Sequence, residues 1–197
     1  MRSKEAFTFV ASGPLSAGIN VALVGYTLSP EVSIDEMVTE IRHALDWLAS
    51  TLPALGADPS KILLSGWSAG AHLAVAAMDH PSVRGCVAIS GIYDLEPMRH
   101  CYVNDKLCLD EDAAQRNSPI RQQSSPALPV AIVIGGAEVP VMYQQSADYA
   151  AERAKCGLPV VFHEIPDANH FSILEGMGRA DGSLMVIVRE AVAAAGL

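Results

Sequence analysis

The segment Lys61-Ile-Leu-Leu-Ser-Gly-Trp-Ser-Ala-Gly-Ala-His-Leu73 joins an apolar run to a Gly-x-Ser-x-Gly motif. The apolar run predicts a strand, and the residues that follow Gly70 predict a helix. In that setting the motif is typical of a nucleophilic serine on a sharp, strained turn, where glycine avoids steric collisions. We therefore predict that Ser68 is a nucleophile and that the amide of Ala69 is an oxyanion donor. The alternative is a Gly/Ser-rich turn that carries no chemistry.

The composition of the 197 residues is typical of one acidic α/β domain. Half of the residues are hydrophobic and 6% are aromatic, and 13 basic residues stand against 22 acidic ones, for a net charge of −9. This charge disfavours nucleic acid and anionic membranes as partners. No apolar run reaches the ~18 residues of a membrane-spanning helix, and residues 1–10 lack the apolar core and cleavage site of a signal peptide. We therefore expect a cytoplasmic protein.

The four cysteines do not have the spacing of a metal site: Cys86, Cys101, Cys108 and Cys156. We interpret them as ordinary thiols of a cytosolic protein, with a redox pair of Cys101 and Cys108 as the alternative. We expect neither a metal nor an organic cofactor.

Strand and helix patterns alternate along the chain. Apolar runs predict strands at 20–26, 61–66, 84–90, 129–135 and 159–165. Helical patterns predict helices at about 4–18, after Ser33, after Ser68, at about 141–155 and from about 183. Ser33 and Glu36 predict a capping box at the start of the second helix. The sequence thus predicts an α/β fold with a mostly parallel, doubly wound sheet and helices on both faces, as one domain over 1–197.

Residues 96–127 are polar, irregular and punctuated by proline, and they show no clear strand pattern. We expect an excursion over the C-terminal edge of the sheet, where a substrate pocket would lie. The excursion has acidic and aromatic side chains at Tyr102, Asp105 and 110–112. They either line that pocket or are solvated, and we favour the second interpretation.

The general base is sought among six histidines. In this architecture the serine, the acid and the histidine follow in that order, each on a loop after a strand. His170 follows the last predicted strand in a loop, where its two ring nitrogens could take the Ser68 proton and bind a carboxylate. His72 lies one turn beyond Ser68 and is expected to point into packing. The others are on a helix, at a helix end, in the excursion or inside a strand: His43, His80, His100 and His163.

The acid has three candidates. Glu138 follows the strand at 129–135 through Gly135-Gly136-Ala137, on the expected loop, and we favour it. Asp94 leaves the preceding strand and is the alternative acid. Asp167 is too close to His170 in sequence to orient it easily.

Several stretches carry a resemblance to a known family: Gly66–Leu73, Gly135–Pro140 with Gln145-Ser146, Asn169–Glu175, Tyr26–Glu31 and Asn117–Pro119. Over essentially its whole length, the chain resembles the arylformamidase (kynurenine formamidase) branch of the α/β-hydrolase superfamily, whose bacterial relatives include small-ester carboxylesterases. The resemblance implies that Ser68 is the nucleophile, Glu138 the acid and His170 the base. Many members have aspartate at the position of Glu138, and glutamate is a known alternative in the superfamily.

The resemblance breaks at the N-terminus. Family members carry a His-Gly-Gly-x-Trp turn that supplies further oxyanion-hole amides and ends a strand between those predicted here at 20–26 and 61–66. The resemblance thus implies an N-terminally truncated α/β-hydrolase fold without a central strand and part of the oxyanion hole. One lost oxyanion donor costs roughly 10²–10³ in kcat. Three explanations would account for the missing strand and turn: a miscalled start, a truncated paralogue, or a homodimer whose partner supplies the missing edge. We favour a fragment of a competent hydrolase.

We therefore predict a serine hydrolase that cleaves a small-molecule ester or an N-formylkynurenine-like aryl formamide by Ser-His-Glu acyl transfer. The alternative is a catalytically impaired hydrolase-fold protein, a truncated paralogue or pseudoenzyme, with a binding role.

Overall fold

A computed structural model describes residues 4–122 and 126–197. Its centre is a parallel sheet with the strand order β1-β2-β3-β4. The strands are β1 (Ile62–Trp67), β2 (Val83–Ile89), β3 (Val130–Gly135) and β4 (Val160–Ile165). These bounds match four of the five predicted strands. Because Trp67 pairs with Ile89 and Ile89 with Val133, the carboxyl ends of the strands meet at one edge of the sheet.

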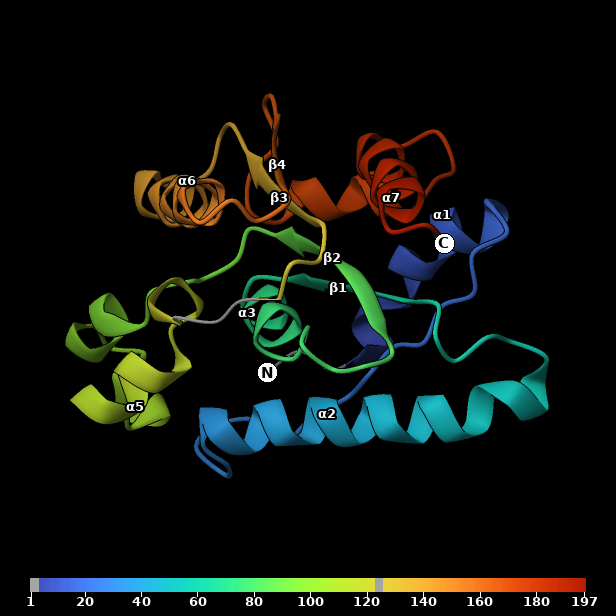
Figure 1. Ribbon diagram of the computed structural model, residues 1–197. Helices are drawn as coiled ribbons and strands as arrows, with labels where there is room; N and C mark the ends of the chain where they lie inside the picture. The colour runs from blue at the N-terminus through green and yellow to red at the C-terminus, as the bar shows by residue number, and fades with distance from the viewer. Residues whose placement is uncertain (1–3, 123–125) are drawn as a thin grey trace.

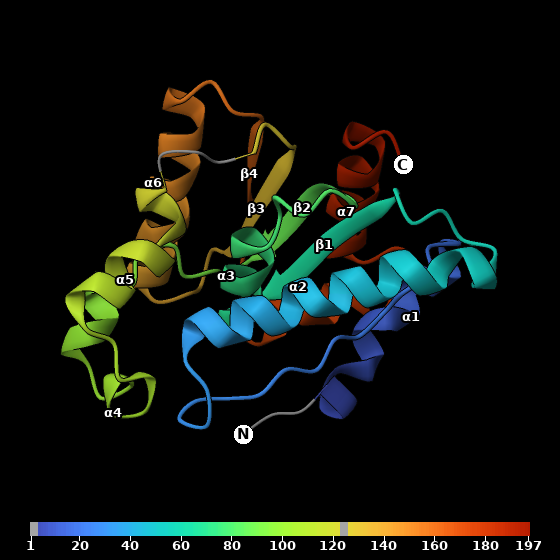
Figure 2. The ribbon, with the colours of Figure 1, turned by 60° about the horizontal axis from the view of Figure 1, so that its bottom comes forward.

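Three helices cover one face of the sheet: α2 (Ile34–Thr51), α3 (Ala69–Ala76) and α6 (Pro140–Lys155). Figure 1 shows α2 and α3 together beside the sheet, and in Figure 2 α2 lies across the front of it. Buried apolar side chains of these helices form one core with β2 and β3, which includes Leu45, Met78 and Tyr149. The predicted capping box starts α2, since Ser33 and Glu36 each bind the other's backbone amide.

The opposite face is covered by the last helix and by N-terminal segments. The N-terminal segments are η1 (Lys4–Ala11) and α1 (Ser12–Ser16), the last helix is α7 (Ser183–Ala194), and the short helix η5 (Ser172–Met177) precedes α7 on the same face. A second core lies here, in which Leu184 and Met185 are fully buried against Val87 and Val133. β3 therefore packs on both faces, as its continuous apolar sequence predicts. The helix predicted at about 4–18 is instead a 3-10 helix followed by one short α-helical segment.

The strand predicted at 20–26 is wrong. Residues 19–28 lie outside any helix or strand, and Val21 and Val24 are each more than a third exposed. A strand is defined by its ladder to a neighbour, and among the described residues β1 pairs only with β2. Apolar sequence alone therefore does not produce a strand here.

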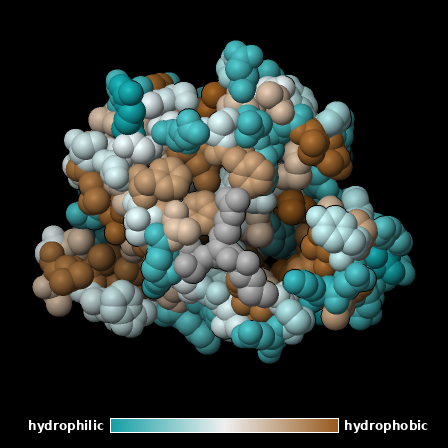
Figure 3. All heavy atoms as spheres, turned by 180° about the vertical axis from the view of Figure 1, so that it is seen from behind, coloured by the Kyte–Doolittle hydropathy of each residue, from teal (hydrophilic) through white to brown (hydrophobic). Residues whose placement is uncertain are grey.

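Figure 3 shows apolar side chains gathered at the surface on the face opposite to the view of Figure 1.

The excursion after β2 is more regular than predicted. Its described part contains four short helical segments: η3 (Glu96–His100), α4 (Asn104–Leu107), α5 (Glu111–Asn117) and η4 (Pro119–Arg121). Leu95, Leu109 and Ala114 pack with Ile34 of α2 in a small separate core. Residues 123–125 of the predicted excursion lie outside the described residues. None of the helices in the described parts of the chain is long and apolar enough to cross a membrane.

Candidate active site

Ser68 lies on the strained turn that its motif predicts. The residue joins the end of β1 to the start of α3 with φ 56° and ψ −120°, a left-handed conformation that costs energy for any residue with a side chain. A Cβ at position 66 would collide with the backbone of Gly70, so glycine is required for this close approach. The carbonyl of Ser68 accepts hydrogen bonds from Ala71 and His72, which fix the turn to the helix.

His170 connects Ser68 to a carboxylate. Its Nε2 lies 3.1 Å from Ser68 Oγ, and its Nδ1 lies 2.8 Å from Glu138 Oε2. These three residues come from the ends of β1, β3 and β4, and the hydrogen bonds span 102 and 32 residues of sequence. The arrangement allows Nε2 to take the hydroxyl proton while the carboxylate holds the Nδ1 proton.

Glu138 is held from several directions. Its side chain is fully buried, whereas that of His170 is 27% exposed. Its Oε1 accepts hydrogen bonds from the Ser90 hydroxyl and, at 3.3 Å, from the Gly135 amide. Burial raises the pKa of this carboxyl, but hydrogen bonds from His170, Ser90 and Gly135 outweigh the burial and hold the pKa below its usual value. Glu138 is therefore ionised at neutral pH and available to orient an imidazole.

Two glycines allow the Glu138 loop to approach the histidine loop. A Cβ at position 135 would collide with the carbonyl of Ala168, and one at 136 would press on the Glu164 carboxylate. The Ala137 amide donates to Ala168 at 3.0 Å, which ties the two loops together. Glycine at position 135 thus has a steric reason: it lets the Glu138 loop approach the backbone of the loop that carries His170.

Ser90 is a site residue that sequence reasoning missed. It follows β2, is completely buried and has φ 50°, and its amide donates to Val133 at 2.7 Å. Its hydroxyl donates to Glu138, 48 residues further on. The one available signal was its position, a serine at the carboxyl end of a predicted strand.

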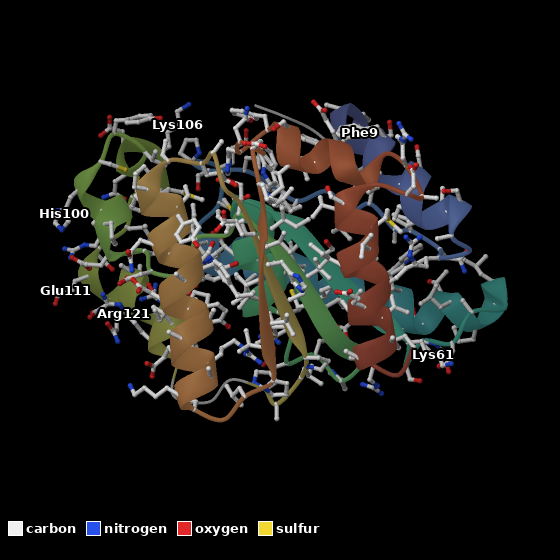
Figure 4. All side chains as sticks on the ribbon, turned by 90° about the horizontal axis from the view of Figure 1, so that it is seen from above. Phe9, Lys61, His100, Lys106, Glu111 and Arg121 are labelled. Atoms are coloured by element: carbon white, nitrogen blue, oxygen red, sulfur yellow. The ribbon has the colours of Figure 1, made fainter. Side chains whose placement is uncertain are left out.

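The alternative acid and the other histidines lie elsewhere. Arg121 makes a bidentate pair with the Asp94 carboxylate: its Nε donates to Oδ1 at 3.0 Å and its Nη2 to Oδ2 at 2.8 Å. The Asp167 backbone has φ 61°, and its loop carries His170. His72 is buried with Nδ1 on the Ile92 carbonyl, as its predicted packing role requires. Figure 4 shows His100 on the outer side of the excursion, with Lys106 and Glu111, away from the sheet.

An oxyanion could bind beside Ser68. Ala69 is the first residue of α3, and the first amides of a helix have no partner within it. The helix dipole also favours negative charge at this end. The Ala69 amide thus lies beside Ser68 at the end of α3 that favours a negative charge.

Among the residues that the structure describes, no group of three or more His, Cys, Asp or Glu side chains is arranged to hold a metal ion. All four cysteines are free thiols, and burial raises the pKa of Cys86 to about 12.

The chain is similar to curated kynurenine formamidases. It is 32% identical to the kynurenine formamidase of Danio rerio over 186 residues, which cover 88% of this chain and 62% of that protein. It is also 32% identical to the kynurenine formamidase of Salmo salar over 193 residues, with 91% and 64% covered. The chain thus spans less than two thirds of the length of these relatives.

The structure resembles a solved esterase. A hyperthermophilic esterase from the archaeon Pyrobaculum calidifontis matches 100% of this chain and 72% of its own, with a TM-score of 0.82 and 19% identity. At that identity the likeness concerns the fold alone. The family model described as "alpha/beta hydrolase fold" matches residues 8–174. With the parallel sheet, the strained serine turn and the sequence relatives, this match identifies the family: the chain belongs to the α/β hydrolases.

Proposed function

We propose that the chain carries the catalytic centre of a serine hydrolase that cleaves a small ester or an aryl formamide. The observation that supports this proposal is the continuous hydrogen-bonded series from Ser68 through His170 to Glu138, at 3.1 and 2.8 Å. Such a series provides a nucleophile, a general base and a group that orients the base.

In the first step the Ser68 oxygen attacks the carbonyl carbon of the substrate. His170 Nε2 takes the hydroxyl proton, and the negative charge of Glu138 stabilises the imidazolium that results. The carbonyl oxygen becomes an oxyanion, for which the Ala69 amide is a donor. When the tetrahedral intermediate collapses, the bond to the alcohol or amine breaks, and His170 returns its proton to that leaving group. A formyl- or acyl-serine remains.

In the second step a water molecule attacks the acyl-serine. His170 takes a proton from the water, a second tetrahedral intermediate forms, and its collapse releases formate or a carboxylic acid while the proton returns to Ser68 Oγ. Every proton moves through one imidazole. The geometry between Ser68 and His170 therefore serves both halves of the reaction.

The substrate class is proposed from the relatives together with the site. Proteins named kynurenine formamidase are 32% identical to this chain. The Phe171 ring, 58% exposed, lies beside the His170 ring at 5.4 Å between centroids. An aromatic surface next to the base suits a substrate with an aryl group. We therefore propose an aryl formamide of the N-formylkynurenine type or a small aryl ester.

The test is turnover of p-nitrophenyl acetate and N-formylkynurenine by the 197-residue chain, with Ser68→Ala as the reference. We expect turnover that falls to background in Ser68→Ala, and the ratio of the two substrates chooses between ester and formamide. If the folded chain shows no Ser68-dependent turnover of either substrate, the proposal fails for this chain. That outcome favours the alternative, a catalytically impaired hydrolase-fold protein with a binding role.

A further inference from the structure

Trp67 contacts the histidine loop in two ways. Its indole Nε1 donates a hydrogen bond to the main-chain carbonyl of His170 at 2.7 Å, across 103 residues of sequence. Its ring also lies against the imidazole, with 4.8 Å between ring centroids and 37° between ring planes. The same side chain therefore holds both the backbone and the ring of His170.

The turn at Ser68 does not itself need tryptophan at position 67. The steric demand of the turn falls on Gly66, where a Cβ would collide with Gly70. Trp67 is the last residue of β1 and directly precedes Ser68. A hydrogen bond from the Trp67 side chain to the His170 carbonyl thus fixes the position of His170 relative to the residue next to Ser68.

The loop that carries His170 benefits from such a tie. It runs between β4 and η5 without regular structure. Asn169 Oδ1 accepts from the amides of Phe171 and Ser172, and the Ala168 carbonyl accepts from the Ala137 amide of the Glu138 loop. Those bonds shape the loop but do not place it relative to β1. A base must be held within roughly 0.5 Å of its productive position to work efficiently. The bond from Trp67 supplies a rigid reference for that placement.

The indole ring is itself fixed by aromatic neighbours. Phe7 and Phe171 each lie 5.7 Å from it, measured between ring centroids, at tilts of 46° and 60°. Contact with two further rings leaves the indole little freedom to rotate. An aromatic face also attracts a cation, so the indole favours the positive charge that His170 acquires when it takes the Ser68 proton.

We propose that Trp67 is a positioning residue for His170. It fixes the histidine backbone by its indole N–H and the imidazole by its ring, and it acts on the reaction through the base rather than through the substrate. This inference rests on the proposed function, since it assigns a role within the same Ser68–His170–Glu138 series.

The kinetic test compares Trp67→Phe with Trp67→Leu. Phenylalanine keeps an aromatic face and loses the N–H, whereas leucine loses both. We expect kcat to fall about 10-fold in Trp67→Phe and further in Trp67→Leu, with KM changed less than about 2-fold, because the contacts lie on the base. Trp47→Phe, at a 61% exposed position on α2, is the matched control and should match the parent chain. A Trp67→Phe variant with unchanged kcat, or with KM alone altered, would overturn the inference.

A spectroscopic test does not depend on turnover. The proton on His170 Nδ1 should give a low-field resonance in ¹H–¹⁵N spectra, assigned by its loss in His170→Gln. We expect this resonance to shift or broaden in Trp67→Phe and to stay unchanged in Trp47→Phe. If it is the same in Trp67→Phe as in the parent chain, the positioning role is wrong. Absence of Ser68-dependent turnover in the parent chain would instead sink the proposed function, while the resonance still decides the role of Trp67.

Discussion

The loops that end β1 to β4 and the helical excursion after β2 are stabilised by different means. The strand-end loops rely on hydrogen bonds to the buried side chain of Glu138 and on positive φ at Ser68, Ser90 and Asp167. The excursion over 96–121 relies on short helices and on ion pairs near the surface, such as Arg116 with Asp35. Cys108 of the excursion also has a positive φ, 51°, so backbone strain alone does not separate the two regions. The strand-end loops differ by their hydrogen bonds to a buried carboxylate, and the excursion by its exposed ion pairs.

The same contrast appears in the energetics of single contacts. Glu138 is fully buried, so a lost hydrogen bond there leaves an unpaired charge. Asp35 and Arg116 are each more than two fifths exposed, so water replaces whatever contact is lost. Exposed pairs of this kind contribute about 0–1 kcal/mol. Substitutions in the strand-end loops should therefore cost more activity and stability than substitutions in the excursion.

The largest effect is expected for Glu138→Gln. The amide keeps the shape of the side chain but removes the charge that holds the Nδ1 proton and stabilises the imidazolium of His170. We expect kcat for p-nitrophenyl acetate to fall about 10³–10⁴-fold, with the fold retained in circular dichroism. Glu152→Gln, an exposed carboxylate of α6 that pairs with Lys155, is the matched control and should keep full activity. Equal activity of the two variants would remove the distinction between the two regions.

A smaller effect is expected for Ser90→Ala. Alanine keeps the Cβ of serine at φ 50°, so the change chiefly removes the hydroxyl that donates to Glu138. Hydrogen bonds to charged groups contribute about 1.5–3 kcal/mol, which corresponds to roughly 10- to 100-fold in kcat if the loss falls on the reaction.

The control for Ser90 is Ser146→Ala on α6. Ser146 is also completely buried, and in the described structure its hydroxyl has no hydrogen-bond partner. We expect kcat of Ser146→Ala to stay within about 2-fold of the parent chain. If both serine variants lose activity to the same extent, burial rather than the bond to Glu138 explains the loss.

Acid should weaken the strand-end loops through Glu138. The folded pKa of this carboxyl lies below the unfolded value of about 4.3, because its hydrogen bonds outweigh its burial. Its contribution to stability is therefore fully present above the unfolded pKa and is lost as the pH falls through the folded pKa. In urea unfolding, the free-energy difference between the parent chain and Glu138→Gln should shrink between pH 7 and about pH 3. A difference that grows as the pH falls would contradict the direction of the shift.

The local patterns of the sequence predicted most of this fold. Continuous apolar runs located β1 to β4, the Ser33–Glu36 pair located the start of α2, and the motif around Ser68 located the strained turn. These features depend on residues close together in the chain. The order of serine, acid and histidine along the chain singled out Glu138 and His170, which the structure places in contact. Their catalytic roles remain predictions.

What the sequence did not predict depends on distant neighbours. Residues 20–26 have the composition of a strand, but a strand needs a partner, and none of the described strands pairs with them. Ser90 and Trp67 look like ordinary strand-end residues. Their contacts reach Glu138 and His170, 48 and 103 residues away. Only the folded arrangement reveals them.

The smallest effect on activity is expected for Asp94→Asn. Asp94 lies just before the excursion and pairs with Arg121 of η4 rather than with His170. Its carboxylate pairs with Arg121, and the two side chains are 29% and 35% exposed. Asp94→Asn should lower the free energy of unfolding by about 1 kcal/mol or less, since water screens the pair, and should change kcat less than about 3-fold. Urea unfolding and p-nitrophenyl acetate turnover of the same preparation measure both. A loss of kcat as large as that of Glu138→Gln would mean that Asp94 reaches His170 during the reaction. The functional distinction between the strand-end loops and the excursion would then no longer hold.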